Sequence, residues 1–289
     1  LSRLRAWAMA SDGVALEERA SDDGMGRLAP DDFEAALLTV IGDWLGQGPI
    51  NIVACGMVGA RQGWHEAAYL TVPSRPHGGA FTRPLTQDER LNVHILPGMM
   101  QLAPADVMRG EETQIAGYLS LHSDFDGILC LPGTHTKWVH ISAGEVVSFQ
   151  TFMTGEIFAL LCEKSVLRHS VQSQEVDHDT FSQAVDDGIT DPARLAARLF
   201  SLRAEDLLHG QDATNARSRL SGLLTGAELG AARPYWLGQA VTLIGDPKLT
   251  SLYASALASQ GVAAKQFVGD DATRSGLVAA HRKLQESLS

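Results

Sequence analysis

Apolar positions in the first half of the chain follow two periods, which predict both strands and helices. The segments 1–9 and 14–20, which mix apolar and charged residues, flank the turn SDG and predict the two strands of a hairpin. Residues 31–46 carry apolar side chains at helical spacing and predict a helix. The short apolar runs at 50–56 and 91–98 are typical of buried strands.

The second half begins again with strands and ends in alternating strands and helices. A strand, a turn and a helix are predicted over 106–121, followed by a meander of strands at 126–133, 137–141 and 145–150. Helices are predicted at 154–168, 178–188, 192–201 and 217–237. The strands at 240–246 and 264–270 are each followed by a helix, at 248–260 and 271–288. This order predicts a duplicated α/β architecture, with ligand sites at the carboxyl ends of strands.

Composition and charge narrow the class of protein. The 289 residues are 45% hydrophobic and 20% charged, as in an ordinary globular protein. The net charge of −11 disfavours nucleic acid as a partner, because an acidic surface repels phosphate backbones. No apolar stretch approaches the roughly 20 residues that span a bilayer, and no signal-peptide pattern is present. The three cysteines form no C-x-x-C pair, so we expect a cytoplasmic protein without a zinc centre.

The stretch LPGTHTKW, at 131–138, is a candidate phosphate-binding turn. It lies between two predicted strands, and the Walker pattern G-x-x-x-x-G-K-[ST] is absent from the chain, which disfavours a P-loop NTPase. Successive backbone N–H groups and the hydroxyls of Thr134 and Thr136 could bind an anion. The turn alone is equally compatible with a plain hairpin in which Gly133 supplies a positive φ and Lys137 faces solvent.

The segment RGEETQIAG, at 109–117, is a candidate acid–base element. Gly110 permits a sharp turn, and Glu111 and Glu112 fall in the first turn of the predicted helix, where the helix dipole favours carboxylates. Helix-start chemistry alone accounts for this pattern. A catalytic role would require one carboxylate within hydrogen-bond reach of a substrate hydroxyl, as a general base.

Together these segments resemble a known family. A Gly-acid turn before a helix, followed by a Gly-Thr hairpin, is similar to the order in sugar kinases of the actin/hexokinase superfamily. GMVGARQGW, VMRGEETQ, LPGTHTKWV, FMTGE and SGLLTGAE resemble the 2-dehydro-3-deoxygalactonokinase family over about residues 50–228. The resemblance implies a two-lobe, actin-like ATPase fold (a duplicated ribonuclease H-like fold) with a central cleft. Residues 1–118 would form the sugar-acid lobe and 119–289 the nucleotide lobe.

The resemblance also implies site residues for ATP and Mg²⁺. Glu111 would be the general base, with Glu112 as the alternative. The residues expected to bind nucleotide phosphates are Gly133, Thr134, His135, Thr136 and Lys137, and those expected to bind adenosine are Gly226, Gly245 and Asp246. The family's first phosphate motif, whose Asp is associated with the Mg-nucleotide, is expected before Leu1, so no metal ligand is assigned.

The implied substrate is 2-dehydro-3-deoxy-D-galactonate, phosphorylated by ATP at its 6-hydroxyl. Its carboxylate calls for an arginine, and Arg5, Arg61 and Arg109 are candidates, although a structural ion pair would explain each equally well. The residues expected to bind this substrate are Arg5, Gly56, Met57, Gly59, Trp64 and Arg109.

Two other functions stay open at this point. A polyphosphatase-like phosphohydrolase of the same superfold also places a Gly-Glu turn before a glycine-rich hairpin, although its hairpin usually carries several glycines. A non-catalytic nucleotide-binding scaffold would fit a chain without the first phosphate motif. The stereochemistry of the substrate, galactonate-derived or gluconate-derived, is not determined by these residues, and the oligomeric state is open, with a homodimer as one option.

Overall fold

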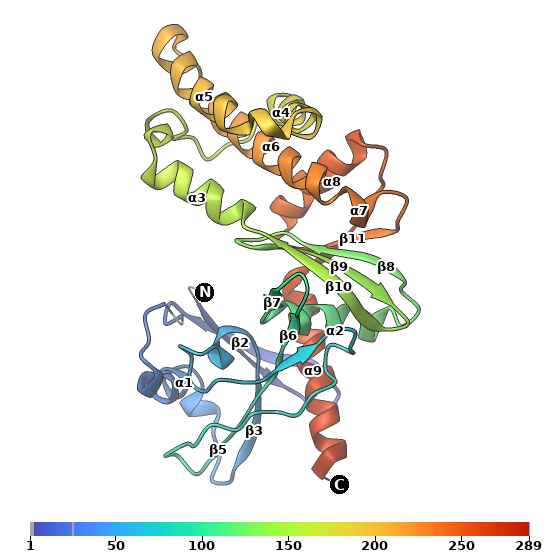
Figure 1. Cartoon of the computed structure of the whole chain (residues 1–289). Coiled ribbons are helices and arrows are strands. Elements are labelled where there is room, and N and C mark those ends of the chain that lie inside the picture. Colours follow the sequence, from blue (N-terminus) through green and yellow to red (C-terminus); the bar gives the residue numbers. More distant parts are fainter. Residues whose placement is uncertain (1–2, 25, 289) are drawn as a thin grey trace. The chain divides into compact units, whose positions relative to one another are not determined.

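The structure is a computed structural model that describes residues 3–24 and 26–288. Helices and strands alternate along the chain, which confirms the predicted mixed α/β class (Figure 1). Internal contacts divide the chain into two compact units. Unit 1 consists of residues 1–125, 144–147 and 270–289, and unit 2 of residues 126–143 and 148–269.

The C-terminal helix belongs to unit 1 from Asp270 onward, so this division differs from the single boundary predicted between residues 118 and 119. Helices α2 (Glu111–Leu121) and α9 (Gly269–Leu288) approach closely at two glycines. A Cβ atom on Gly117 would lie 1.9 Å from the carbonyl oxygen of Ala272, and one on Gly276 would lie 2.0 Å from that of Thr113. Only glycine permits this approach, which holds the last helix against the first part of the chain.

The first elements of unit 1 agree with the sequence pattern. Strand β1 (Leu4–Met9) pairs antiparallel with β2 (Ala15–Ser21), which confirms the two predicted strands. Helix α1 (Phe33–Ile41) is shorter than predicted, because the chain tightens into a 3₁₀ turn at Gly42. Strand β3 (Ile50–Ala54) pairs in parallel with β5 (Leu91–Ile95); β5 is mostly buried, as predicted, whereas no residue of β3 is fully buried.

A small second sheet in unit 1 was largely missed by the sequence pattern. It has the order β4 (Tyr69–Thr71), β6 (Gly98–Gln101) and β7 (Asp106–Met108). Only β7 was predicted. Strands of three or four residues are too short to show a period, so β4 was hidden in the glycine-punctuated loop after β3.

Unit 1 has an apolar core between α1 and the β3–β5 pair. Its buried members are Leu37, Val40, Ile41, Ala67, Leu91, Val93 and Ile95. These side chains come from one face of α1 and from alternate positions of β5, which is how amphipathic elements bury a shared face.

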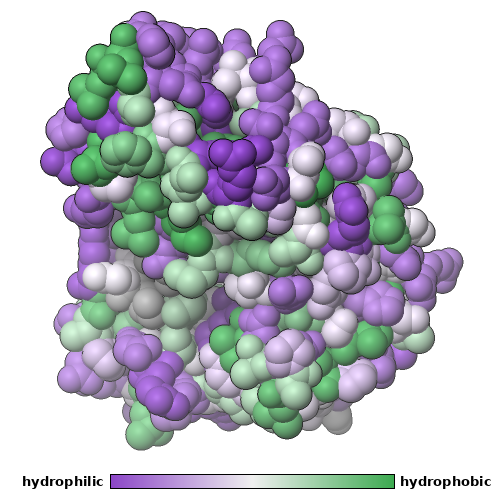
Figure 2. Space-filling model, turned by 45° about the horizontal axis from the view of Figure 1, so that its top comes forward, coloured by the Kyte–Doolittle hydropathy of each residue, from purple (hydrophilic) through white to green (hydrophobic). Residues whose placement is uncertain are grey.

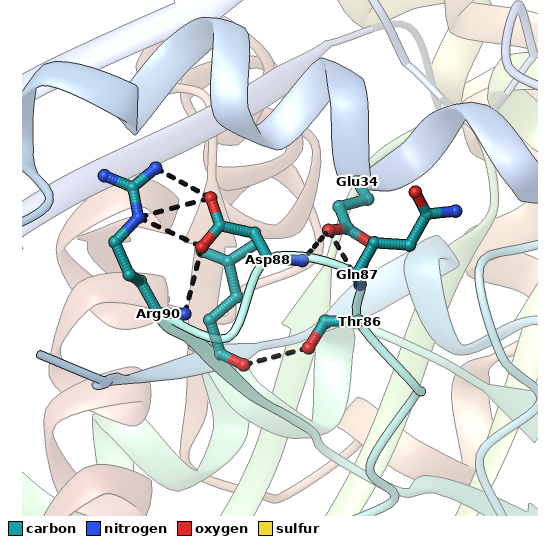
Figure 3. Close-up of polar contacts among 6 residues, drawn as sticks. Glu34, Thr86, Gln87, Asp88 and Arg90 are labelled. Carbon is teal, nitrogen blue, oxygen red and sulfur yellow. Dashed lines mark hydrogen bonds and ion pairs between the residues drawn. The ribbon is translucent and has the colours of Figure 1, made fainter.

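Helix α1 also fixes the loop that leads into β5. The Glu34 carboxylate accepts hydrogen bonds from the backbone N–H groups of Gln87 (2.9 and 3.0 Å) and Asp88 (2.8 Å), as Figure 3 shows. Asp88 in turn pairs with Arg90 at 2.7 Å, and this hydrogen bond lowers the pKa of Asp88 to about 2. The last residues of the loop before β5 are therefore held by charge-assisted hydrogen bonds.

Unit 2 contains a five-stranded sheet in the order β10-β9-β8-β11-β12. Strand β8 (Gly127–Leu131) pairs antiparallel with β9 (Thr136–Ser142), which is followed by β10 (Glu145–Phe152). Strands β11 (Val241–Gly245) and β12 (Lys265–Val268) extend the sheet in parallel, with α8 (Pro247–Ser259) between them. The meander and the final βαβ arrangement were both predicted from the sequence.

The other helices of unit 2 lie between β10 and β11. They are α3 (Thr154–Lys164), α4 (His178–Thr190), α5 (Leu195–His209), α6 (Ala213–Ala231) and α7 (Arg233–Trp236). Helices α4 and α6 pack side by side through glycines: a Cβ atom on Gly222 would lie 2.4 Å from the carbonyl oxygen of Phe181. Trp138 and Trp236 are fully buried in the core beside the sheet. Within the described part of the chain, no helix is long and apolar enough to cross a membrane.

Candidate functional site

In unit 1 the predicted Gly-acid turn joins β7 to α2. Gly110 has a φ of 109°, which a side chain would strain, and it is the N-cap residue of α2. A Cβ atom there would lie 3.3 Å from Cα of Gly56, so the turn adjoins the loop that follows β3. Glu111, the first residue of α2, is half-buried, and its carboxylate accepts a hydrogen bond from the backbone N–H of Arg109 (3.1 Å).

The neighbouring acid is in a different environment. Glu112 is 0% exposed, and its carboxylate accepts hydrogen bonds from the backbone N–H of Gly110 (2.5 Å) and the hydroxyl of Thr113 (3.0 Å). Burial, and secondarily the charge of Glu111, raises the pKa of Glu112 to about 7. Burial, and secondarily the charge of Glu112, also raises the pKa of the Cys55 thiol to about 12. The Glu112 side chain is thus enclosed, whereas Glu111 is only half-buried; neither glutamate lines the cavity of unit 1.

A cavity of about 810 Å³ lies within unit 1, and it brings most of the predicted substrate residues together. Its lining includes Arg5, Gly56, Met57, Trp64 and Arg109, together with residues of β1, β3, α1 and α9. Gly59 does not line it, because that glycine is buried against Ile95 and Arg109. Trp64 stacks on Phe33 with ring centroids 6.4 Å apart, so its ring is held in place at the cavity wall.

Of the three candidate arginines, Arg109 is the one without a carboxylate partner among the described residues. Its Nη2 donates to the carbonyl oxygen of Ala67 (2.7 Å), and its guanidinium lies over the ring of Tyr69, 4.2 Å from the centroid. Its Nε and Nη1 atoms are buried and have no hydrogen-bond partner among the described residues. Two buried guanidinium nitrogens without a partner, on a half-buried residue that lines a cavity, suit an anionic ligand.

The other two candidate arginines are already paired. Arg5 Nη1 lies 2.5 Å from the Asp270 carboxylate, and Arg61 lies 3.5 Å from that of Glu66, with 79% of the Arg61 side chain exposed. For Arg61 a surface ion pair is therefore a sufficient explanation. Arg5 lines the cavity, but Asp270 offsets its charge.

In unit 2 the candidate phosphate turn joins β8 to β9. Among the described residues, none accepts a hydrogen bond from the backbone N–H groups of Gly133, Thr134 or His135. A Cβ atom on Gly133 would meet no atom within 4 Å, so the space above the turn is open. Three successive donors beside open space suit an anion such as a phosphate.

Two details of the plain-hairpin alternative are wrong. Gly133 does not have a positive φ, so the backbone of the turn does not need a glycine there. Lys137 does not face solvent: its residue is only 4% exposed, within β9. The open space above Gly133, rather than its backbone conformation, is what distinguishes this position.

The start of α3 packs against the candidate phosphate turn. His135 Nε2 lies 2.5 Å from a carboxylate oxygen of Glu156, and the backbone N–H of Glu156 donates to the carbonyl oxygen of Thr134 (2.9 Å). A Cβ atom on Gly155 would lie 2.2 Å from the carbonyl oxygen of Gly133. The close contact at Gly155 and the His135–Glu156 pair therefore fix the conformation of the turn.

Thr136, the first residue of β9 after the turn, takes part in a buried hydrogen-bond network. Its hydroxyl lies 3.2 Å from the Tyr253 hydroxyl, which donates to Glu228 (2.9 Å), and the indole N–H of Trp138 donates to the other Glu228 oxygen (2.9 Å). Burial raises the pKa of Glu228. Because Thr136 is 0% exposed, its hydroxyl serves this network, which corrects the expectation that it faces a phosphate.

The three predicted adenosine residues lie in different surroundings. Gly245 ends β11 beside the phosphate turn, with its would-be Cβ 3.3 Å from the carbonyl oxygen of Pro132. Asp246 is the N-cap of α8, and its carboxylate accepts from the backbone N–H of Lys248 (2.9 Å). Gly226 is buried inside α6, where a Cβ atom would lie 2.2 Å from the carbonyl oxygen of Val185 in α4. Helix packing accounts for this glycine, and its backbone is closed to a purine.

Comparison with known proteins shows to which family the chain belongs. The model of the 2-keto-3-deoxy-galactonokinase family matches residues 1–280. The chain belongs to this family. The resemblance inferred from five short motifs is thus confirmed over nearly the whole chain, and the protein is a member of a family of sugar-acid kinases.

Individual members of the 2-keto-3-deoxy-galactonokinase family match along their whole length. The chain is 38% identical to "Probable 2-dehydro-3-deoxygalactonokinase DgoK1" of Rhizobium meliloti (strain 1021), over 98% of this chain and 94% of that protein. It is 35% identical to 2-dehydro-3-deoxygalactonokinase of Escherichia coli (strain K12), over 96% and 93%. The structure titled "Crystal structure of a putative 2-dehydro-3-deoxygalactonokinase protein from Sinorhizobium meliloti" superposes with a TM-score of 0.90 at 38% identity, covering 98% of this chain and 96% of that chain.

Two acids of this family member were given no role from the sequence. Glu156 pairs with His135, and Glu228 joins Trp138 and Tyr253, although both glutamates lie in motifs that carried the family resemblance. Each partner is separated by about twenty residues or more from its glutamate. No local periodicity predicts such pairs, so only the three-dimensional structure identifies them.

Proposed function

We propose that this chain is an ATP-dependent kinase that phosphorylates 2-dehydro-3-deoxy-D-galactonate at its 6-hydroxyl, in the catabolism of galactonate. Family membership and the names of its relatives support a kinase of this substrate class. The structural observation that carries the proposal is the Arg109 side chain, which lines the cavity and has two buried nitrogens without a partner among the described residues. A small sugar acid supplies the carboxylate that this group lacks.

The acceptor site is assigned to the unit 1 cavity. Arg109 would donate to the carboxylate through Nε or Nη1, the two guanidinium nitrogens that have no partner among the described residues. Gly56 and Met57 present backbone to the sugar chain, and Trp64 forms an apolar wall. Arg5 contributes positive potential at the same cavity, reduced by its pair with Asp270.

Glu111 is proposed as the general base. It lies two residues after Arg109 and one after Gly110, and its carboxylate is half-exposed at the start of α2. It would accept the proton of the 6-hydroxyl as the oxygen bonds to phosphorus. Glu112 is proposed as a positioning residue instead, because its carboxylate is enclosed by Gly110 and Thr113.

The donor site is assigned to unit 2. The backbone N–H groups of Gly133, Thr134 and His135 would hold phosphate oxygens of ATP, and Gly245 and Asp246 would lie beside the adenosine. Thr134 would add its hydroxyl, while Thr136 and Lys137 support the turn from within β9. ATP supplies the phosphoryl group, and Mg²⁺ screens the phosphate charge.

The residues present fit a nucleotide better than a separately bound metal ion. Among the described residues, no group of three or more histidine, cysteine, aspartate or glutamate side chains could hold a metal ion. Mg²⁺ often keeps water and phosphate ligands with only one or two carboxylates, so it would arrive with the nucleotide. We further propose that units 1 and 2 correspond to the two lobes of an actin-like kinase, in the cytoplasm where ATP is available.

A coupled assay tests the proposal against its alternatives. ADP release that depends on the keto-deoxy acid supports the kinase. Phosphate release without a sugar acid would support the phosphohydrolase instead. Release of neither ADP nor phosphate, with any sugar acid tested, would support the scaffold. The panel should include the gluconate-derived epimer, since a single pocket contact decides between the two substrates.

A further inference from the structure

Helix α5, in unit 2, has an apolar outer face. Its large outward residues are Phe200, Leu207 and Leu208, which are 65%, 66% and 75% exposed. Ala196 and Ala197 are also exposed, and Ala204 is half-buried. These residues recur every three to four positions and so form one stripe along the helix. Figure 2 shows a group of hydrophobic residues at its upper left, on the side where α5 lies in Figure 1.

The core of unit 2 is covered by a different face of the same helix. Leu202 is 0% exposed, and Leu195 and Leu199 pack against the same cluster of buried side chains from α6 and the segment after α3. Helix α5 is therefore apolar on both its inner and its outer face. A surface helix normally carries polar residues on its outer face, so an apolar one marks an interaction surface.

We propose that this face of α5 binds the same face of α5 in a second copy of the chain, as an antiparallel helix pair. The large and small side chains of the stripe are placed so that two copies of it fit together. A two-fold axis at the level of Leu202 would place each Phe200 opposite the Ala204 of the partner. It would also place Ala196 and Ala197 opposite the Leu207 and Leu208 of the partner, so that every large side chain meets an alanine.

This register follows from equal spacing about one position. Phe200 and Ala204 are both two residues from Leu202. Ala196 and Ala197 precede Leu202 by six and five residues, while Leu207 and Leu208 follow it by five and six. Alanines opposite large side chains let two helices approach to the usual interaxial distance of roughly 8–10 Å without a void. Two parallel copies would instead bring large residues against large ones.

The charges at the two ends of the stripe are also complementary. Arg194 directly precedes α5, is exposed, and pairs with no carboxylate of a described residue. Asp212 lies three residues after α5, is exposed, and uses Oδ1 to cap α6. An antiparallel pair brings each arginine to the end of the partner helix that carries the aspartate. It also opposes the two helix dipoles favourably.

The test is the oligomeric state of the full chain, measured by sedimentation or by light scattering over a range of concentrations. The unmodified protein should dimerise, and Leu207→Glu should raise the dissociation constant at least about tenfold. Leu85→Glu is the matched control, since Leu85 is 96% exposed in unit 1 and should leave the dimer unchanged. A circular-dichroism melt of each variant confirms that it is folded.

A size swap tests the register itself. Ala204→Phe alone should weaken the dimer, because two phenylalanines would then collide, and Phe200→Ala alone should weaken it by leaving a void. The double variant should restore the dimer, since each phenylalanine again meets an alanine. A monomeric unmodified protein, a dimer indifferent to Leu207→Glu, or a double variant no better than the single ones would each overturn the proposal.

Discussion

The backbone N–H of Gly110 donates a hydrogen bond of 2.5 Å to the Glu112 carboxylate, in a position where Glu112 is 0% exposed. The same turn leaves the adjacent Glu111 half-exposed. Two glutamates that are neighbours in sequence thus acquire different chemistry from one turn. The enclosed acid is bonded to the Gly110 turn, and the half-exposed one is the proposed general base.

Replacing Glu112 by Gln should change how stability depends on pH. The pKa of Glu112 is raised to about 7, so its ionisation opposes folding, and the free energy of unfolding falls as pH rises from about 4.5 to about 7. Glu112→Gln should remove up to about 3 kcal/mol of this fall, because a neutral amide has no charge to bury. Denaturant unfolding at pH 5 and pH 8 measures the difference. An unchanged pH dependence in the variant would show that Glu112 is not the group responsible.

Replacing Glu111 by Gln should abolish most of the kinase activity without disturbing the nucleotide site. Loss of a general base costs on the order of 10² to 10⁴ in kcat. Nucleotide affinity, measured by calorimetry with a non-hydrolysable ATP analogue, should stay within about twofold, because the phosphate turn belongs to unit 2. If Glu111→Gln kept full activity while Glu112→Gln lost it, the two assignments would have to be exchanged.

The sequence predicted elements well wherever an apolar period ran for five or more residues. Strands β8 and β11 and helices α2 and α8 are examples. The order of the Gly-acid turn and the Gly-Thr hairpin is also as predicted, although only Gly110, with its φ of 109°, is required by the backbone, and Gly133 is not. By contrast β4, with three residues, gives no period to detect.

The site could be predicted only in part, because its side chains contact residues that are distant in the sequence. From the sequence, a structural ion pair would explain Arg5 as well as Arg109, and only their surroundings separate them: Arg5 has a carboxylate partner, and Arg109 has two buried nitrogens without a partner. Gly226 looked like a backbone contact for adenosine but is a contact between α4 and α6. Burial decides both cases, and burial depends on elements that are distant in the chain.

Arg109 should be required for binding of the sugar acid. Arg109→Lys keeps the positive charge but loses the fork that can bind a carboxylate through two N–H groups, so KM for the acid should rise roughly 10- to 100-fold. KM for ATP should be unchanged. Arg61→Lys is the control, because Arg61 forms only an exposed pair with Glu66 and should retain ordinary kinetics. Equal effects of the two substitutions would remove Arg109 from the acceptor site.

Gly133 should be required for nucleotide binding but not for folding. A methyl group at this position meets no protein atom within 4 Å, and the backbone there does not have a positive φ, so Gly133→Ala should melt at nearly the temperature of the unmodified protein. The same methyl group would occupy the space above three unpaired N–H groups and obstruct a phosphate there. KM for ATP should therefore rise at least about tenfold, a cost of roughly 1.4 kcal/mol. Gly48→Ala, also in open space with an ordinary φ, is the matched control for adding a methyl group. A Gly133→Ala enzyme with normal KM for ATP would place the phosphates elsewhere in unit 2.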